Sequence, residues 1–107
     1  MAIKFRPGKR HLVFTSEKHL TRAVTKACAR ENLTFAIVGA EDVEDLKNQT
    51  EAFEDGDVKV LILHRGLLHG WHVRLTDEQV DVHFVGEFRP EEIVQGMGRL
   101  SSPNLGQ

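Results

Sequence analysis

The stretch Gly86-Glu-Phe-Arg-Pro-Glu-Glu-Ile-Val-Gln-Gly-Met-Gly-Arg99 decides the fold of this chain. The apolar run that precedes it, Val80–Val85, is typical of a strand. Pro90 then opens a helix, because the first helical position does not need the amide hydrogen that proline lacks. The side chains predicted to face inward from this helix are Ile93, Val94 and Met97. We therefore expect a strand-to-helix junction here.

Upstream of this junction, apolar runs alternate with segments of helical period. The other predicted strands are His11–Thr15, Leu33–Val38 and Val58–Leu63. A first helix is predicted from its N-cap Ser16 to about Asn32. Its apolar face consists of Leu20, Ala23, Val24, Ala27 and Cys28. An acidic second helix is predicted from Glu41 to Asp55, closed by Gly56 as C-cap. Its inward side chains are Val43, Leu46, Thr50 and Phe53.

Two segments lack a clean period. His64 to Gln79 is predicted to be a long loop, and Ser101 to Gln107 a polar tail. The order β-α-β-α-β-loop-β-α implies a mostly parallel sheet with right-handed crossovers. We predict one three-layer α/β domain over residues 1–107, with residues 1–9 as an N-terminal arm. Its sheet has four or slightly more strands, with helices on both faces.

The charge of the chain is small but unevenly distributed. The 107 residues carry a net charge of −2, yet residues 1–30 carry +7 and residues 31–57 carry −8. A basic segment of this kind attracts nucleic acid or an acidic protein, although balanced surface charge for solubility gives the same pattern. The lone Cys28 and the absence of a signal peptide or a long apolar run lead us to expect a cytoplasmic protein with no membrane contact.

The first predicted helix carries a ladder of basic residues at four-residue spacing. Its members are Lys18, Arg22, Lys26 and Arg30. Like charges at this spacing repel by a few tenths of a kcal/mol per pair. The ladder is therefore unfavourable unless an external partner benefits from it, which favours a binding face. The acidic segment from Glu41 to Asp57 is more simply a solvated surface, with mimicry of nucleic acid as the alternative.

The chain has no self-contained catalytic pattern. A phosphate-binding loop requires Gly-x-x-x-x-Gly-Lys-Ser/Thr after a strand, whereas Gly8-Lys9 is followed by Arg10 and precedes the first strand. Cys28 falls on an apolar helix face, where a buried thiol is the default. Four histidines invite a zinc interpretation, but their spacing does not complete a ligand set. These are His64, His69, His72 and His83. We predict no metal and no cofactor.

The whole pattern resembles the second RecA-like domain, the C-terminal domain, of superfamily 2 helicases and translocases. The similarity covers roughly residues 10–100 and is nearest to the Snf2-type branch. It rests on an apolar strand ending in Thr15 and Ser16, on Gly39, on Phe53-Glu-Asp-Gly56, and on Gln95-Gly-Met-Gly-Arg99. The resemblance implies a RecA-like, P-loop-type topology, here without a P-loop. It also implies that Gln95 and Arg99 are remnants of a nucleotide-contacting motif, able to act only in trans on another protein's ATPase domain.

The chain departs from this family at two motifs. His64 and Arg65 stand where the family has Thr-Asp, and in the Arg-Gly-x-Asp motif that follows only Gly70 remains. Ser102 stands where a second arginine is expected. Such arginines stabilise charge on the transferring phosphoryl group. Because the first RecA-like domain is also missing from the sequence, we predict that the chain is not an enzyme by itself.

Three hypotheses about function follow. The first is a nucleic-acid-binding or helicase-associated accessory protein, with DNA favoured over RNA. The family's contacts with the nucleic-acid backbone, together with the basic ladder, give as candidates Thr15, Ser16, Lys18, Arg22, Gly39, Arg65 and Gly70. The second is a module that docks on a separate helicase ATPase domain, as an inhibitor or as half of a split enzyme. The third is a metal-dependent enzyme at the histidine-rich loop.

Overall fold

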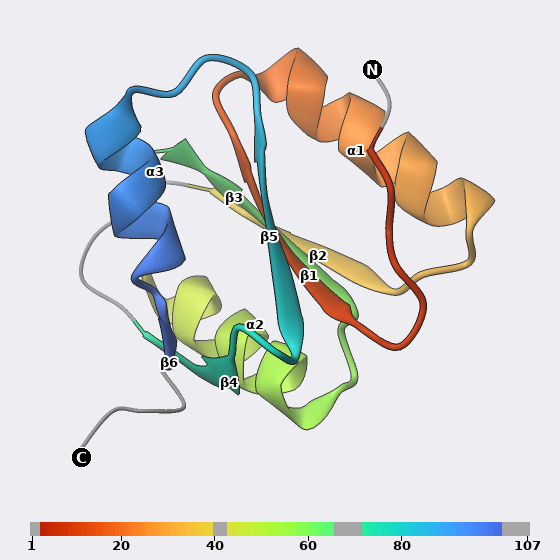
Figure 1. Ribbon diagram of the computed structural model, residues 1–107. Coiled ribbons are helices and arrows are strands. Elements are labelled where there is room, and N and C mark those ends of the chain that lie inside the picture. The colour runs from red at the N-terminus through yellow and green to blue at the C-terminus, as the bar shows by residue number, and fades with distance from the viewer. Residues whose placement is uncertain (1–2, 40–42, 66–71, 102–107) are drawn as a thin grey trace.

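Four parallel strands form the centre of the fold in the order β2-β3-β1-β5 (Figure 1). The structure, a computed structural model, describes residues 3–39, 43–65 and 72–101. Its elements are β1 (Arg10–Thr15), α1 (Lys18–Arg30), β2 (Phe35–Val38), α2 (Val43–Asp55), β3 (Val60–His64), β4 (Val73–Thr76), β5 (Val80–Val85), α3 (Pro90–Met97) and β6 (Leu100–Ser101). The strands β4 and β6 form a separate parallel pair.

The helices cover both faces of the sheet, so the predicted three-layer α/β fold is confirmed. Alternate residues of a strand point to opposite faces. Val13 therefore packs with Val24 and Cys28 of α1 on one face. Leu12 packs on the other face, in the same cluster as Phe53 of α2. The helices α2 and α3 and the small β4-β6 sheet all lie on this second side (Figure 1).

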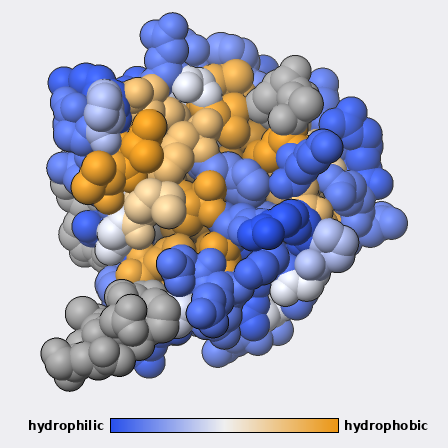
Figure 2. Space-filling model, viewed as in Figure 1, coloured by the Kyte–Doolittle hydropathy of each residue, from blue (hydrophilic) through white to orange (hydrophobic). Residues whose placement is uncertain are grey.

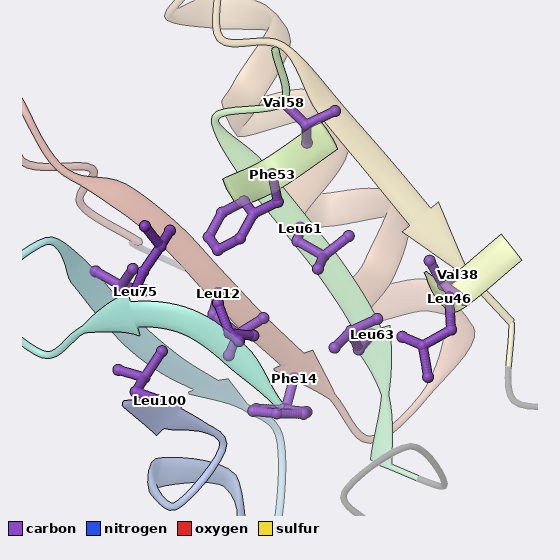
Figure 3. Close-up of a cluster of buried hydrophobic side chains, with 12 residues drawn as sticks. Leu12, Phe14, Val38, Leu46, Phe53, Val58, Leu61, Leu63, Leu75 and Leu100 are labelled. Atoms are coloured by element: carbon purple, nitrogen blue, oxygen red, sulfur yellow. The ribbon is translucent and has the colours of Figure 1, made fainter. Parts of the chain in front are cut away.

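The larger core cluster lies between the sheet and α2 (Figure 3). Leu61 and Leu63 of β3 point from the sheet toward Phe53 and Leu46 of α2. Val60 and Ile62 are also fully buried, but on the α1 side. The strand β3 is therefore buried on both faces. The predicted inward positions of α2 are confirmed for Leu46, Thr50 and Phe53; the side chain of Val43 lies outside the described residues.

The prediction of a loop from His64 to Gln79 was wrong in two places. His64 completes β3, and Val73–Thr76 forms β4, with alternating buried and exposed side chains. The partner of β4 is Leu100–Ser101, a two-residue strand that ends in Ser101, where we predicted the polar tail to begin. The Val73 amide donates to the Arg99 carbonyl at 2.8 Å. Pairing between segments so short and so distant leaves almost no periodic signal in the sequence.

The N-cap of α1 is Glu17 rather than the predicted Ser16, and its side chain makes no capping hydrogen bond. The Ser16 amide instead donates to the Val85 carbonyl at 3.1 Å, which extends the β1-β5 ladder by one residue. Ser16 is consequently buried next to Gly86, whose φ is +110°. Ser16 therefore extends the sheet and does not cap the helix.

The orientation predicted for α3 was also wrong. Ile93, Val94 and Met97 are exposed, at 38%, 71% and 47% of their surface. The residues that α3 buries are Glu92 and Gly96, which are four positions apart on one helix face. A Cβ on Gly96 would come within 2.6 Å of the Phe84 ring and 3.0 Å of the Phe14 ring. The helix thus approaches the sheet through a glycine, which turns its apolar residues outward.

The predicted N-terminal arm packs against the domain. Phe5 is buried in the α1-side cluster, together with Val13 of β1. Directly after the arm, the guanidinium of Arg10, the first residue of β1, donates to the carbonyls of Phe53 and Glu54 at 3.0 and 2.6 Å. These are carbonyls of the last turn of α2, which lack helical partners and carry partial negative charge. Gly56 follows with φ +92° and closes the helix as predicted.

Candidate functional site

The carboxyl ends of the parallel strands bring most of the sequence-predicted binding residues to one edge of the sheet. Thr15 and Ser16 follow β1, Gly39 follows β2, and Arg65 follows β3. Ligands of open parallel sheets bind at this edge. Thr15 and Ser16 are buried, and the Thr15 hydroxyl lies 2.6 Å from the Thr21 hydroxyl of α1. Gly39 is exposed at the edge. Two more positions of interest, Gly70 and Ser102, lie outside the described residues.

Arg65 connects this edge to α3. Its Nη2 and Nε donate to the two carboxylate oxygens of Glu92 at 2.7 and 3.3 Å. Its guanidinium also lies 5.2 Å from the centre of the Phe88 ring, within range of a cation–π contact. The hydrogen bond from Arg65 is the main reason that the pKa of the Glu92 carboxyl is lowered. Arg65 thus holds the first turn of α3 against the end of β3.

Gln95 and Arg99, the remnants of the nucleotide-contacting motif, lie at the C-terminal end of α3. Both are partly buried. The Arg99 Nε donates to the Gln95 carbonyl at 3.1 Å, so one edge of this guanidinium contacts the helix itself. The Arg99 carbonyl accepts the Val73 amide of β4. The structure therefore places the motif next to the small β4-β6 sheet, a neighbour that the sequence did not reveal.

The basic ladder occupies the outer surface of α1. All four of its side chains are exposed, whereas Val24, Ala27 and Cys28 on the inner face of the same helix are buried. Lys18 and Arg22 belong to the first turns of α1, which directly follow the Thr15-Ser16 edge. The structure therefore brings these two cations close in the chain to the predicted edge residues.

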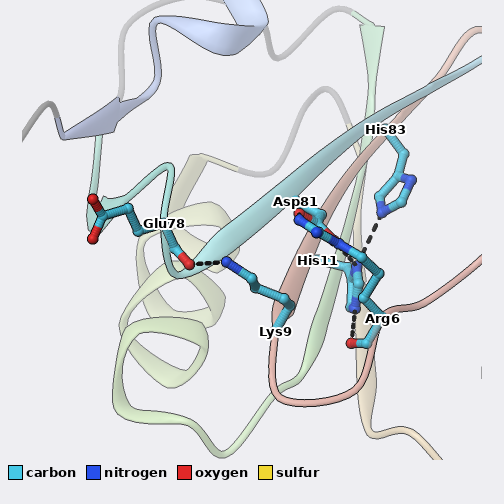
Figure 4. Close-up of polar contacts among 6 residues, drawn as sticks. All are labelled: Arg6, Lys9, His11, Glu78, Asp81 and His83. Carbon is cyan, nitrogen blue, oxygen red and sulfur yellow. Dashed lines mark hydrogen bonds and ion pairs between the residues drawn. The ribbon is translucent and has the colours of Figure 1, made fainter.

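A second polar cluster lies between β1 and β5 (Figure 4). The sequence pointed to His83 only as a companion of the loop histidines and gave no signal for His11 or Asp81. The cluster consists of His11, Asp81 and His83, and one potential ligand atom of each lies within 4.8 Å of the other two. It is the one group of this kind in the part of the chain that the structure describes. His11 is buried, and its Nδ1 lies 3.0 Å from the Nε2 of His83. His64 and His72 do not belong to this cluster, and His69 lies outside the described residues.

The β1-β5 register explains why these side chains meet. His11 pairs with Asp81 and Val13 pairs with His83, so His11, Asp81 and His83 point to the α1 side of two adjacent strands. Asp81 also accepts hydrogen bonds from the Arg6 guanidinium, including one from Nε at 2.7 Å. Strand alternation in His11–Thr15 and Val80–Val85 placed these residues on a common face, but the sequence alone did not reveal the lateral pairing of the strands.

Burial and hydrogen bonds shift the pKa values of this cluster. Burial lowers the pKa of His11 and of His83, so both imidazoles are neutral at pH 7. The hydrogen bond from Arg6 lowers the pKa of Asp81, which is therefore ionised. The cluster thus combines two neutral imidazoles with one carboxylate.

The buried Cys28 does not have the properties of a nucleophile. Burial raises the pKa of its thiol to about 11. A thiol with a raised pKa carries little of the reactive thiolate at neutral pH. This agrees with the sequence-based interpretation of Cys28 as part of the apolar core, and the structure places it there beside Val24.

The sheet order, the helices on both faces and the polar carboxyl edge define this chain as a RecA-like α/β domain. A solved structure described as the C-terminal part of the Fun30 ATPase domain has the same fold, with a TM-score of 0.71 and 16% sequence identity. The match covers 92% of this chain but 32% of that chain. At this level of identity the match shows the fold, and it confirms the predicted resemblance as a likeness in fold to the C-terminal part of an ATPase domain. No protein-family model and no curated protein matches the sequence.

None of the helices in the described ranges is long and apolar enough to cross a membrane.

Proposed function

We propose that this helicase-like domain binds nucleic acid and does not hydrolyse ATP by itself. The observation that carries the proposal is the exposed basic ladder on α1, from Lys18 to Arg30. Its four like charges repel one another along the helix, which costs free energy in the unbound protein. Binding to a polyanion would make the interactions of the same charges favourable. Because Lys18 and Arg22 adjoin the carboxyl edge, a bound strand would follow α1 toward that edge. Gly39 is exposed there, whereas Thr15 and Ser16 are buried beneath it.

The proposed lack of autonomous ATP turnover rests on the residues that the chain lacks. Its sequence has no phosphate-binding loop, and phosphoryl transfer depends on such groups to position the phosphates and neutralise their charge. Arg65, which follows the β3 strand, is held by Glu92 in an internal ion pair. Gln95 and Arg99 could then act only on a nucleotide bound by another protein.

Neutralising the first half of the ladder should weaken binding to nucleic acid. We expect Lys18→Gln with Arg22→Gln to lower the affinity for single-stranded DNA at low salt by about tenfold or more. Each phosphate contact that is lost also removes the favourable free energy of releasing a counterion from the DNA. The slope of log affinity against log salt should also become shallower by about 1.4 for two contacts. Fluorescence anisotropy with labelled single-stranded DNA, double-stranded DNA and RNA measures both quantities.

A matched control uses two exposed lysines away from α1. Lys47→Gln with Lys59→Gln removes the same number of charges from α2 and from the residue before β3. This control should keep the wild-type affinity and salt slope within error. If the wild-type chain binds none of the three nucleic acids at low salt, or if both double variants lose affinity equally, binding through α1 is excluded. ATP turnover should stay at background with or without nucleic acid.

A second candidate function is docking on the ATPase domain of a separate helicase. The observation that favours it is the outward orientation of Ile93, Val94 and Met97 on α3 (Figure 2). Figure 2 shows apolar surface over this helix, which also carries Gln95 and is followed two residues later by Arg99. An exposed apolar patch next to such a motif fits a contact with another protein. In this arrangement Arg99 would be presented in trans.

Acidic substitutions on α3 test the docking function. We expect the wild-type protein to change the ATP turnover of a helicase from the same cell. Val94→Glu with Met97→Glu should raise the concentration required for that effect by about tenfold or more, since truncating one central apolar contact already costs more than about 1 kcal/mol at many interfaces. Lys47→Gln with Asn48→Glu, at two exposed positions of α2, changes the net charge equally and is the matched control. Docking is refuted if the wild type leaves the turnover unchanged or if the α3 variant acts as well as the wild type.

A further inference from the structure

We propose that His11, Asp81 and His83 form a binding site for a divalent transition-metal ion such as Zn²⁺. The site would take one nitrogen from each imidazole and one oxygen from the carboxylate, with solvent in the fourth position. Two imidazoles and one carboxylate with an open position are a donor set that suits zinc and related first-row metals. The site lies between β1 and β5, and none of its residues belongs to the proposed nucleic-acid edge.

The distances between the donor atoms fit this ion. Metal–nitrogen bonds of 2.0–2.1 Å in a tetrahedral site place the ligand atoms about 3.4 Å from one another. The His11 Nδ1 lies 3.0 Å from the His83 Nε2 and 4.0 Å from the Asp81 Oδ2. The first separation must therefore open by a few tenths of an ångström and the second must close by a similar amount. The third, between His83 and Asp81, is within 4.8 Å and must close by at most about 1.4 Å to reach the same spacing. Movements of this size require side-chain adjustment but no change in the strands.

The surroundings of His11 prepare it as a ligand. Its Nε2 lies 3.2 Å from the backbone carbonyl of Arg6, and because a carbonyl oxygen accepts only, this nitrogen carries the proton (Figure 4). The lone pair of Nδ1 then faces His83. Metal-bound histidines usually donate their second N–H to a carbonyl or carboxylate in this way. Phe5 contacts both imidazoles edge-on, with ring centres 4.9 and 5.9 Å away, and gives the site an apolar wall.

His83 changes its tautomer when the ion binds. Without the ion its Nε2–H donates to the His11 Nδ1, since that atom has only a lone pair to offer. With the ion bound, Nε2 supplies its lone pair to the metal and the proton sits on Nδ1, so no proton is released overall. Solvent can exchange this proton, because His83 and Asp81 both line an open surface hollow, together with Lys4 and Val85.

Arg6 competes with the ion for Asp81. Its guanidinium holds both carboxylate oxygens and is itself a positive charge next to the site. The Arg6 side chain is 64% exposed, so it can withdraw from Oδ2 into solvent while its backbone carbonyl stays on His11. Removing the Arg6 charge should therefore strengthen metal binding. If the cluster served only as an internal ion pair, the same substitution would only lower the stability of the fold.

Titration of the 107-residue chain with Zn²⁺, followed by isothermal calorimetry and thermal unfolding, tests the site. We expect one ion per chain and a rise in Tm, because an ion that binds the folded state stabilises it. His83→Gln and the shape-conserving Asp81→Asn should each lower the affinity by about 100-fold or more. Substituting a residue that only hydrogen-bonds to a metal ligand lowers the affinity by about 10- to 100-fold, so a larger loss indicates direct coordination. Arg6→Gln should bind severalfold more tightly. Co²⁺ should give the visible absorption of a tetrahedral site.

Two sets of variants separate this site from other histidines. His19→Gln removes an exposed imidazole of α1 and should leave the affinity unchanged. His64→Gln with His72→Gln should also leave it unchanged. The proposal is overturned if wild-type protein takes up no stoichiometric Zn²⁺, if folded Asp81→Asn and His83→Gln bind as tightly as the wild type, or if binding disappears with His64 and His72 instead.

Discussion

Gly86→Ala is expected to destabilise the domain by about 3–5 kcal/mol, the combined cost of backbone strain and overpacking. Gly86 has φ +110°, a conformation that L residues with a side chain rarely adopt. An added Cβ would lie 1.9 Å from the Ser16 Oγ and 2.7 Å from the Leu20 Cδ1. Both neighbours are part of the packed junction between β1 and α1, so neither strain nor overlap can be relieved locally.

Urea unfolding followed by circular dichroism measures this loss. The matched control is Gly39→Ala, at a glycine that also follows a strand of the sheet. A Cβ there meets no atom within 4 Å, and its φ is not in the left-handed region. The control should therefore stay within about 0.5 kcal/mol of the wild type. A Gly86→Ala variant as stable as the control would show that the β5–α3 turn does not have this conformation.

The same substitution bears on the candidate edge. Gly86 allows the β5–α3 connection to approach Ser16, whose amide pairs with the Val85 carbonyl. A side chain here would separate the end of β5 from the start of α1. We therefore expect any Gly86→Ala protein that still folds to change the arrangement of Thr15 and Ser16 at the carboxyl edge.

Phe14→Ala is expected to cost about 3–5 kcal/mol, the range for removing a fully buried phenylalanine. Phe14 is 0% exposed, and its ring stacks on Phe84 at 5.4 Å between centres. The same ring lies beneath Gly96, where α3 makes its closest approach to the sheet. The cavity left by alanine would lie between β1, β5 and α3, so α3 loses part of its support.

Phe35→Ala is the control for this substitution. Phe35 lies on the edge strand β2 and is 40% exposed, so its loss should cost less than about 1 kcal/mol. Equilibrium urea denaturation gives both free energies. Since small domains are stable by about 5–15 kcal/mol, Phe14→Ala should remain folded in water with a clearly lowered midpoint. Equal losses for the two phenylalanines would contradict the core described above.

Local patterns were reliable where the residues that fold together are also neighbours in the sequence. The apolar runs His11–Thr15 and Val80–Val85 became β1 and β5, and Gly56 closes α2 as predicted. Their alternation with helical segments was enough to predict a parallel sheet with helices on both faces. The match to the C-terminal part of the Fun30 ATPase domain confirms this fold.

Predictions that depended on tertiary contacts were less reliable. Ser16 has the chemistry of an N-cap, but pairing with Val85 buries it. The period of Ile93, Val94 and Met97 indicated a helix, but not which side would face the sheet. Gly96 decides this, because it allows α3 to approach Phe14 and Phe84 directly. No local pattern contains that information, since it depends on aromatic side chains from two distant strands.

The candidate sites divide in the same way. The sequence alone determined the fold class, the basic ladder on α1 and the gathering of Thr15, Ser16 and Gly39 at one edge, because strand alternation, helical period and parallel order are local or topological properties. Only the tertiary structure decided that Arg65 binds Glu92 and that His11, Asp81 and His83 meet. Those contacts depend on strand register and on the approach of α3, and both are set by packing across the whole domain.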